Sequence, residues 1–214
     1  MGGRAKCLLE LQGHSLLERL VRSVRSLRQL QPVLVLGHHA VAIQAHLAQW
    51  PPHLAPVHVI NPAPGDDPAP SLHLGLQALG GNHQAVMVLL ADQPLIDTTD
   101  IGAVLSAFQR RPPGCQVLMP MVNGVPGHPV MMDASVRADL LAVHGASLRQ
   151  WRAAHPRATR PWVVDNLHYT RDLDTPHDLD ILARDTGWVW RWPGSAPGVH
   201  TDGSFAGRQA GPGK

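Results

Sequence analysis

The sequence predicts an α/β fold in which helices cover both faces of a mostly parallel β-sheet. Segments with helical periodicity alternate along the chain with short apolar segments. The apolar segments, such as the one from Val33 to Leu36, are continuous runs rather than strictly alternating patterns. Continuous runs are typical of strands that are buried on both faces. In sheets of this kind, ligands bind beyond the carboxyl ends of the strands.

The helices are predicted from apolar residues at spacings of three and four and from the residues that flank them. Ser15 and Glu18 have the spacing of a capping box. Ser71 is the expected cap of a later helix, which ends at Gly80 and Gly81. The predicted helices cover residues 15–30, 41–50, 71–79, 99–110, 135–143 and 147–155, and a last helix opens with Thr175, Pro176 and Asp178.

The strands are predicted from the apolar runs that lie between these helices. They cover residues 32–37, 57–60, 85–91, 116–120, 128–132 and 162–164. Residues 61–70 contain four prolines and predict a loop. Trp188, Trp190 and Trp192 alternate as they do on one face of a strand. This pattern favours an edge strand that packs on the domain, and the alternative is a surface for a partner.

The composition indicates one globular domain. Of the 214 residues, 44% are apolar and 16% are charged, which is enough for one domain with a buried core. We expect a single domain over residues 1–192, and we expect the Gly/Pro/Ser-rich residues 193–214 to form a disordered tail. The net charge of +2 and the scattered arginines predict that nucleic acid is not a partner.

The sequence lacks the features of membrane insertion and export. Its longest apolar run, from Ala85 to Ala91, is too short to span a bilayer, and no signal peptide follows Met1. Cys7 and Cys115 have no CxxC partner. We therefore expect a cytoplasmic protein without a membrane partner, whose two thiols are free core residues rather than nucleophiles.

Acidic residues flank two of the predicted elements. Asp92 comes directly after the most apolar strand, at the carboxyl edge of the sheet. There it either bridges a hard cation to phosphates or caps the turn before Pro94. Asp172 and Asp174 alternate just before a helix. Either one of them faces Asp92 and completes a magnesium site, or Asp174 only caps the helix and Asp172 meets solvent.

Two further segments have both a structural and a functional interpretation. Lys6 follows Gly2 and Gly3, and a lysine beside a glycine turn can neutralise phosphate charge, although the sequence contains neither a Walker motif nor G-x-G-x-x-G. Gly127-His128-Pro129 is a tight turn into a strand. Alone, this tripeptide indicates only a structural turn.

Taken together in their order along the chain, these segments resemble the motifs of the molybdopterin-type, or MobA-like, nucleotidyltransferase family. The resemblance is closest to its molybdenum cofactor cytidylyltransferases. The similarity covers residues 1–184. Each motif is short, and their common order makes them specific together. The matching segments are Met1 to Leu9, Gly13 with Ser15 to Leu17, Asn61-Pro62, Ser71 to Leu76, Leu90 to Leu95, Gly127 to Val130, and Asp172 to Leu179.

The resemblance implies a Rossmann-like three-layer sandwich of the nucleotide-diphospho-sugar transferase type. It also implies that a nucleoside triphosphate, with CTP favoured, binds together with Mg²⁺. A phosphate of a molybdopterin-type cofactor then attacks the α-phosphorus in line, and pyrophosphate leaves. The protein mainly positions groups and stabilises charge. A molybdenum enzyme is a further expected partner, as the recipient of the product.

The same resemblance implies a role for each site residue. Lys6 and Asp92 are the expected catalytic residues, and they bind the nucleotide together with Asn61 and Ser71. The second substrate is expected to dock on Gly127, His128 and Pro129. The magnesium ligands are expected to be Asp92, Asp172 and Asp174.

The sequence departs from the family pattern at its start. Family members begin with a strand and a glycine-rich loop of the form Leu-Ala-Ala-Gly-x-Ser-x-Arg, whereas this sequence starts at the Met-Gly that follows that loop. A central strand is needed to pair the backbone groups of its neighbours. We therefore expect the natural protein to begin upstream, by roughly 15 to 20 residues, about one strand and one turn.

Other functions remain as alternatives. The chain could be a guanylyltransferase of the same cofactor, or a nucleotidyltransferase for a sugar or another small phosphate. A different class is a non-catalytic accessory protein that binds the cofactor and passes it to a molybdenum enzyme. A plain α/β binding module is the third alternative, and the joint presence of Lys6, Asp92 and Asp172 in matching contexts argues against it.

Overall fold

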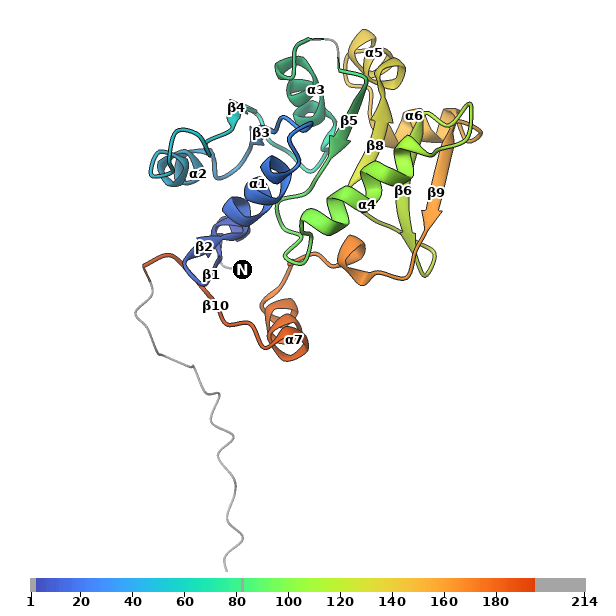
Figure 1. Cartoon of the computed structure of the whole chain (residues 1–214). Helices are drawn as coiled ribbons and strands as arrows, with labels where there is room; N and C mark the ends of the chain where they lie inside the picture. Colours follow the sequence, from blue (N-terminus) through green and yellow to red (C-terminus); the bar gives the residue numbers. More distant parts are fainter. Residues whose placement is uncertain (1–2, 82, 195–214) are drawn as a thin grey trace, which may run out of the picture.

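Strands between residues 85 and 163 form the main sheet of the computed structural model, which describes residues 3–81 and 83–194 (Figure 1). The strands β5 (Ala85–Val88), β8 (Val130–Asp133), β6 (Val117–Val122) and β7 (Val125–Pro126) pair in that order. β9 (Thr159–Val163) pairs with β6 as well. The main sheet therefore combines five strands.

Two smaller sheets lie beside it. β3 (Val33–Leu36) and β4 (Val57–Ile60) form a parallel pair. β1 (Glu10–Leu11) pairs antiparallel with both β2 (His14–Ser15) and β10 (Trp190–Arg191). The two ends of the described chain thus meet in one sheet, as Figure 1 shows.

The α/β class is confirmed, but the prediction of a mostly parallel sheet is not. Only the pairs β3–β4 and β6–β9 are parallel, and the other pairs among the described strands are antiparallel. The link from β6 to β8 spans only residues 123–129, which is too short for the crossover that a parallel pair needs. The apolar runs report burial on both faces, and burial does not determine strand direction.

The helices differ in detail from the predicted ranges. α1 ends at Ser26 rather than near Leu30. α3 begins at Ala69, with Pro70 in its first turn, so Ser71 is not its cap. The helical segments are η1 (Lys6–Leu8), α1 (Leu16–Ser26), α2 (Ala40–Leu47), α3 (Ala69–Ala78), α4 (Thr98–Gln109), α5 (Ala134–Ala142), α6 (Leu148–Ala154), η2 (Leu167–Thr170) and α7 (Pro176–Thr186).

Helices cover both faces of the main sheet, because successive residues of its strands point to opposite faces. In β6, Leu118 and Val122 pack with residues of α1 and α4. Val117 and Met119 of the same strand pack with residues of α3, α5 and α6. The sheet is therefore the middle layer between two layers of helices (Figure 1).

The last part of the described chain packs against the first part. Leu173 is fully buried, together with Leu9, Leu16 and Leu182. Trp190 and Trp192 pack on the same cluster, and Trp190 lies in β10. The tryptophan repeat therefore does pack on the domain as an edge strand, as its pattern favours.

Two predictions concern the chain as a whole. In the described residues, no helix is long and apolar enough to cross a membrane. The tail predicted at residues 193–214 lies outside the described residues, except for Pro193 and Gly194.

Candidate active site

The residues expected at the site gather at one edge of the main sheet. β5 and β8 are antiparallel with Val88 opposite Val130, so the end of β5 lies beside the start of β8. Asp92 follows β5 and His128 precedes β8. Both residues therefore lie at the same edge of the sheet, the edge at which the loops can form a ligand site.

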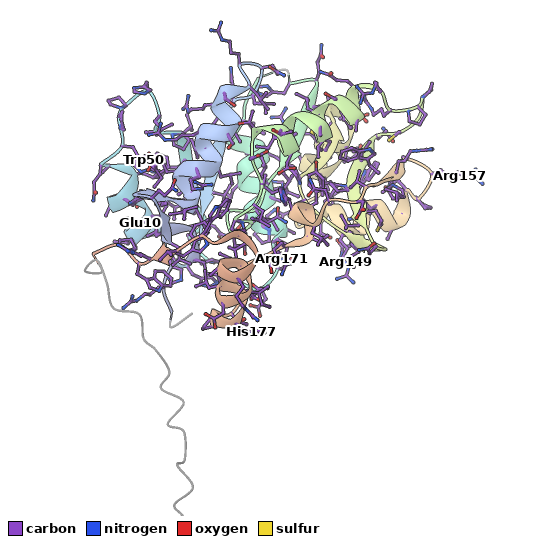
Figure 2. The ribbon with its side chains drawn as sticks, turned by 60° about the horizontal axis from the view of Figure 1, so that its bottom comes forward. Glu10, Trp50, Arg149, Arg157, Arg171 and His177 are labelled. Carbon is purple, nitrogen blue, oxygen red and sulfur yellow. The ribbon has the colours of Figure 1, made fainter. Side chains whose placement is uncertain are left out.

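A second acidic loop, between η2 and α7, reaches this edge. The Leu173 N–H donates to the Asp92 carbonyl at 3.0 Å, and Gln93 Nε2 donates to Asp172 Oδ1 at 3.0 Å. The buried Leu173 side chain fixes the loop from the other side. Figure 2 looks onto this part of the molecule, where Arg171 lies at the start of the loop and His177 lies in the first turn of α7, which follows the loop. Asp92 and Asp172 are thus held next to each other by two hydrogen bonds.

The electrostatics of Asp92 reflect this neighbour. Burial raises the pKa of its carboxyl above the ordinary value, and the negative charge of Asp172 raises that pKa further. The positive charge of Lys6 acts in the opposite direction. Two half-buried carboxylates at one edge repel each other, and a cation between them would relieve the repulsion.

Asp174, the third expected metal ligand, is paired with Lys6. Lys6 Nζ donates to Asp174 Oδ1 at 2.8 Å, and the two side chains are 30% and 68% exposed. Asp174 does not cap α7, because the cap is Thr175 with Asp178 as its capping-box partner. Lys6 therefore lies beside the acidic loop, with a carboxylate as its present partner.

The donor set fits a divalent cation that also uses ligands from a substrate. Among the described residues, no group of three or more His, Cys, Asp or Glu side chains could hold a metal. Asp92 and Asp172 remain as two carboxylates at one edge. Mg²⁺ is commonly bound through one or two carboxylates together with substrate phosphates and water. The two residues therefore suit a cation carried by a triphosphate better than a site made of protein ligands alone.

Asn61 and Ser71 are brought together by their side chains. Asn61 is buried at the end of β4, and its Nδ2 donates to Ser71 Oγ at 3.0 Å. Its Oδ1 accepts from the Ala63 N–H at 3.0 Å. Because Ser71 Oγ accepts from Asn61, its own proton is left to donate to a ligand. Among the described residues, this pair shares no hydrogen bond with the Asp92 loop.

The turn at residues 127–129 packs closely against η2. The His128 N–H donates to the Tyr169 carbonyl at 2.9 Å, and the His128–Pro129 peptide is cis. A Cβ on Gly127 would clash with the carbonyl oxygen of Tyr169, so only glycine fits there. This close contact fixes the backbone of the turn from which the His128 side chain projects.

The surroundings of His128 favour the neutral form of its imidazole. Burial lowers its pKa below the ordinary value, and the positive charge of Arg152 lowers it as well, while Asp172 raises it. Burial and the nearby Asp92 also raise the pKa of Cys7, to about 11. Cys7 is thus a thiol packed on a core cluster, and Cys115 is buried in another. The prediction that both cysteines pack in the core agrees with the burial of Cys115 and with the partial burial of Cys7.

Three residues of this site escaped the sequence analysis. Gln93 and Tyr169 link the acidic loop to the 127–129 turn. Asp100 accepts hydrogen bonds from Asn166 and His168 beside them. Tyr169 is the single tyrosine of the chain and Gln93 adjoins Asp92, which are weak signals. Their contacts join residues more than 60 positions apart, so no local pattern could have indicated them.

The comparison with sequence families gives one match. The family model of the MobA-like NTP transferase domain matches residues 1–159. A search of curated protein sequences found no match.

Several solved structures have a similar fold. Rv0371c from Mycobacterium tuberculosis is 23% identical with a TM-score of 0.64, over 85% of this chain and 90% of that one. The complex of Rv0371c with manganese is 23% identical with a TM-score of 0.62, over 85% of this chain and 93% of that one. Molybdopterin-guanine dinucleotide biosynthesis protein A from Archaeoglobus fulgidus is 16% identical with a TM-score of 0.62, over 86% of this chain and 92% of that one.

A CMP:2-keto-3-deoxy-manno-octonic acid synthetase complexed with CTP is also similar. It is 13% identical with a TM-score of 0.59, over 85% of this chain and 91% of that one. At these identities the likeness to the solved structures establishes the fold.

Proposed function

Because the chain belongs to the MobA-like NTP transferase family, and is therefore a nucleotidyltransferase, we propose that it transfers CMP from CTP to a molybdopterin-type cofactor. A phosphate oxygen of the acceptor forms a new bond to the α-phosphorus of CTP. The bond from the α-phosphorus to the β-phosphate bridging oxygen breaks, and pyrophosphate leaves with that electron pair. A molybdenum enzyme is the proposed recipient of the product.

The observation that carries the proposal is the pairing of Asp92 with Asp172 beside Lys6 and His128. The Asp92 backbone carbonyl accepts from the Leu173 N–H and the Asp172 carboxylate accepts from Gln93, so the two residues are held side by side. The positive charge of Lys6 partly offsets the rise in the pKa of Asp92. Phosphoryl-type transfer needs little covalent help from side chains, and positive charge and fixed geometry are its main requirements. This edge of the sheet offers the fixed geometry, and Lys6 together with a cation on the two carboxylates would supply the positive charge.

In this proposal Asp92 and Asp172 hold Mg²⁺. When bound, the cation neutralises the triphosphate and the charge that develops on the leaving pyrophosphate. One of the solved structures with a similar fold is a complex with manganese, which supports a divalent metal. Lys6 releases Asp174 and donates to a phosphate oxygen of the nucleotide instead. This exchange is easy because the Asp174 side chain is exposed and the Lys6 ammonium group has three protons to donate.

The remaining residues position the two substrates. The free proton of the Ser71 hydroxyl donates to the nucleotide, and Asn61 holds that hydroxyl in place. The acceptor docks on the turn formed by Gly127, His128 and Pro129. The lowered pKa of His128 favours its neutral form, which can offer a hydrogen bond to the acceptor without adding a charge. CTP as donor is supported by the similar synthetase that was solved with CTP.

A guanylyl transfer is the second candidate. It is favoured by the similarity to the Archaeoglobus fulgidus protein, whose name refers to a guanine dinucleotide. The acceptor would be the same, and only the base would differ. A nucleotidyltransferase for another small phosphate and a non-catalytic accessory protein are the remaining alternatives.

The test is pyrophosphate release from CTP or GTP with Mg²⁺, with and without molybdopterin. We expect release with CTP that depends on the acceptor and is lost in Asp92→Asn. Asp180→Asn, an exposed carboxylate on α7, is the matched control and should retain activity. Pyrophosphate release from GTP but not from CTP, in the presence of molybdopterin, would favour the guanylyl alternative. Binding of molybdopterin without any release would favour the accessory protein.

A further inference from the structure

Gln93 is a buried amide at the centre of the site. Its side chain is only 5% exposed, and a buried amide is costly unless its hydrogen bonds are made. Its Nε2 donates to the Tyr169 carbonyl at 3.0 Å and to Asp172 Oδ1 at 3.0 Å. Both partners are acceptors only, so the NH₂ group, which has two protons, is the end that must face them.

The Tyr169 carbonyl connects Gln93 to the acceptor turn. This oxygen also accepts from the His128 N–H at 2.9 Å, and a carbonyl has two lone pairs for two donors. Gly127 packs so closely on the same carbonyl that a Cβ would clash with it. A continuous chain of hydrogen bonds therefore runs from Asp172 through Gln93 and Tyr169 to His128.

The Tyr169 end of this chain is firmly anchored. The Tyr169 ring is 2% exposed, and its hydroxyl donates to the Asp100 carbonyl at 3.2 Å. The buried Asp100 carboxylate accepts from Asn166 Nδ2 at 2.8 Å and lies 2.9 Å from His168 Nδ1. These contacts tie η2 to the start of α4. The position of the Tyr169 carbonyl is thus set by the fold rather than by the ligand.

We propose that Gln93 is a positioning residue that fixes the Asp172 carboxylate relative to both Asp92 and the acceptor turn, an assignment that rests on the proposed function. Gln93 binds one lone pair of Asp172 Oδ1, so the carboxylate is held in one orientation and keeps its other lone pairs for a cation. Asp92 and Gln93 are neighbours in the chain and hold the neighbours Leu173 and Asp172. The metal subsite and the acceptor subsite are in this way one hydrogen-bonded unit.

The first test replaces Gln93 with residues of similar size. Gln93→Met removes the side-chain N–H donor. Gln93→Glu places a carboxylate, which only accepts hydrogen bonds, against the Tyr169 carbonyl and the Asp172 carboxylate, which also only accept. Loss of an outer-shell partner of a metal ligand commonly costs 10- to 100-fold in metal affinity. We expect Mn²⁺ affinity in the presence of CTP, measured by electron paramagnetic resonance of free Mn²⁺, to fall by about tenfold in both variants. Gln109→Met, an exposed glutamine at the end of α4, is the control and should not change it.

A double variant separates positioning from general structure. If Gln93 acts through Asp172, then Gln93→Met should weaken Mn²⁺ binding little in an Asp172→Asn background, because the two losses are not additive. Equal losses in both backgrounds would overturn the proposal. If Gln93→Met does not fold, Gln93→Glu replaces it in this comparison of single and double variants.

The kinetic readout distinguishes failure of this inference from failure of the proposed function. We expect Gln93→Met to raise the KM for the acceptor and lower kcat, with the KM for CTP changed less. An active wild-type protein with an unchanged Gln93→Met variant would overturn the positioning role alone. An inactive wild-type protein would overturn the proposed function, and the Mn²⁺ titration would still decide the role of Gln93.

Discussion

Lys6 Nζ lies 2.8 Å from Asp174 Oδ1, so the lysine expected at the triphosphate is bonded to a carboxylate expected at the metal. The two expected roles compete in this arrangement. Both side chains are partly exposed, and exposed ion pairs are weak and screened by salt. A triphosphate, with several negative charges, can therefore displace Asp174 from the lysine.

This pairing leads to a prediction for Asp174→Asn. Removing the competing charge frees Lys6, so CTP should bind more tightly, by up to about fivefold, the value of an exposed ion pair. Isothermal titration with CTP and Mg²⁺ checks it. Asp180→Asn is the control for loss of an exposed acid on α7. Weaker binding of both CTP and Mn²⁺ would instead identify Asp174 as a metal ligand.

The packing of Gly127 leads to a second prediction. In Gly127→Ala the new Cβ meets the Tyr169 carbonyl oxygen, and relief of such a clash costs about 1–3 kcal/mol of unfolding free energy. Urea unfolding measures this cost. Gly102→Ala in α4 is the matched control, since a Cβ there meets nothing within 4 Å, and it should stabilise the helix by about 0.5–1 kcal/mol. Equal stabilities of the two variants would contradict the close contact.

Local patterns predicted elements well and contacts poorly. The strand at residues 57–60 and the helix that opens with Thr175 and Pro176 were predicted from residue type and spacing alone, because β-propensity and capping act over a few residues. The start of α3 was predicted wrongly, since Pro70 fits the first turn of a helix as well as a loop. Strand direction was not predictable, because it depends on which strands meet.

The site shows the same division. The resemblance supplied Asp92, Asp172 and His128 as candidates, and the structure brings their loops to one edge. The resemblance did not indicate that Lys6 would pair with Asp174, 168 positions away. Nor did it indicate that Gln93 would donate a hydrogen bond to Tyr169, 76 positions away. Such contacts arise only when the sheet and the buried Leu173 bring distant loops together.

The raised pKa of Asp92 predicts how the protein without metal responds to pH. Its carboxyl is protonated more readily in the folded than in the unfolded state. Its contribution to stability is therefore fully present below the unfolded pKa and is lost as pH rises through the folded pKa. At pH 7 with a chelator present, Asp92→Asn should melt at a higher temperature than the wild type. In the presence of Mg²⁺ and CTP the order should reverse, because only the wild type gains from binding.

Thermal melting with and without the chelator checks this pair of outcomes. Asp180→Asn provides the baseline for loss of a carboxylate that is exposed. An Asp92→Asn variant that is less stable than the wild type under both conditions would show that the carboxylate has a structural rather than a ligand-binding role.

The lowered pKa of His128 predicts the opposite behaviour at mildly acidic pH. Its imidazole resists protonation in the folded state, so its contribution to stability is present above the unfolded pKa, near 6.5, and is lost as pH falls through the folded pKa. The wild type should therefore lose unfolding free energy below pH 6.5, and His128→Gln should lose less over the same range. Urea unfolding between pH 5 and 7 measures both slopes. His53→Gln, an exposed histidine in the loop before β4, should follow the wild type, and a His128→Gln slope equal to that of the wild type would show that His128 is not the group that loses stability on protonation.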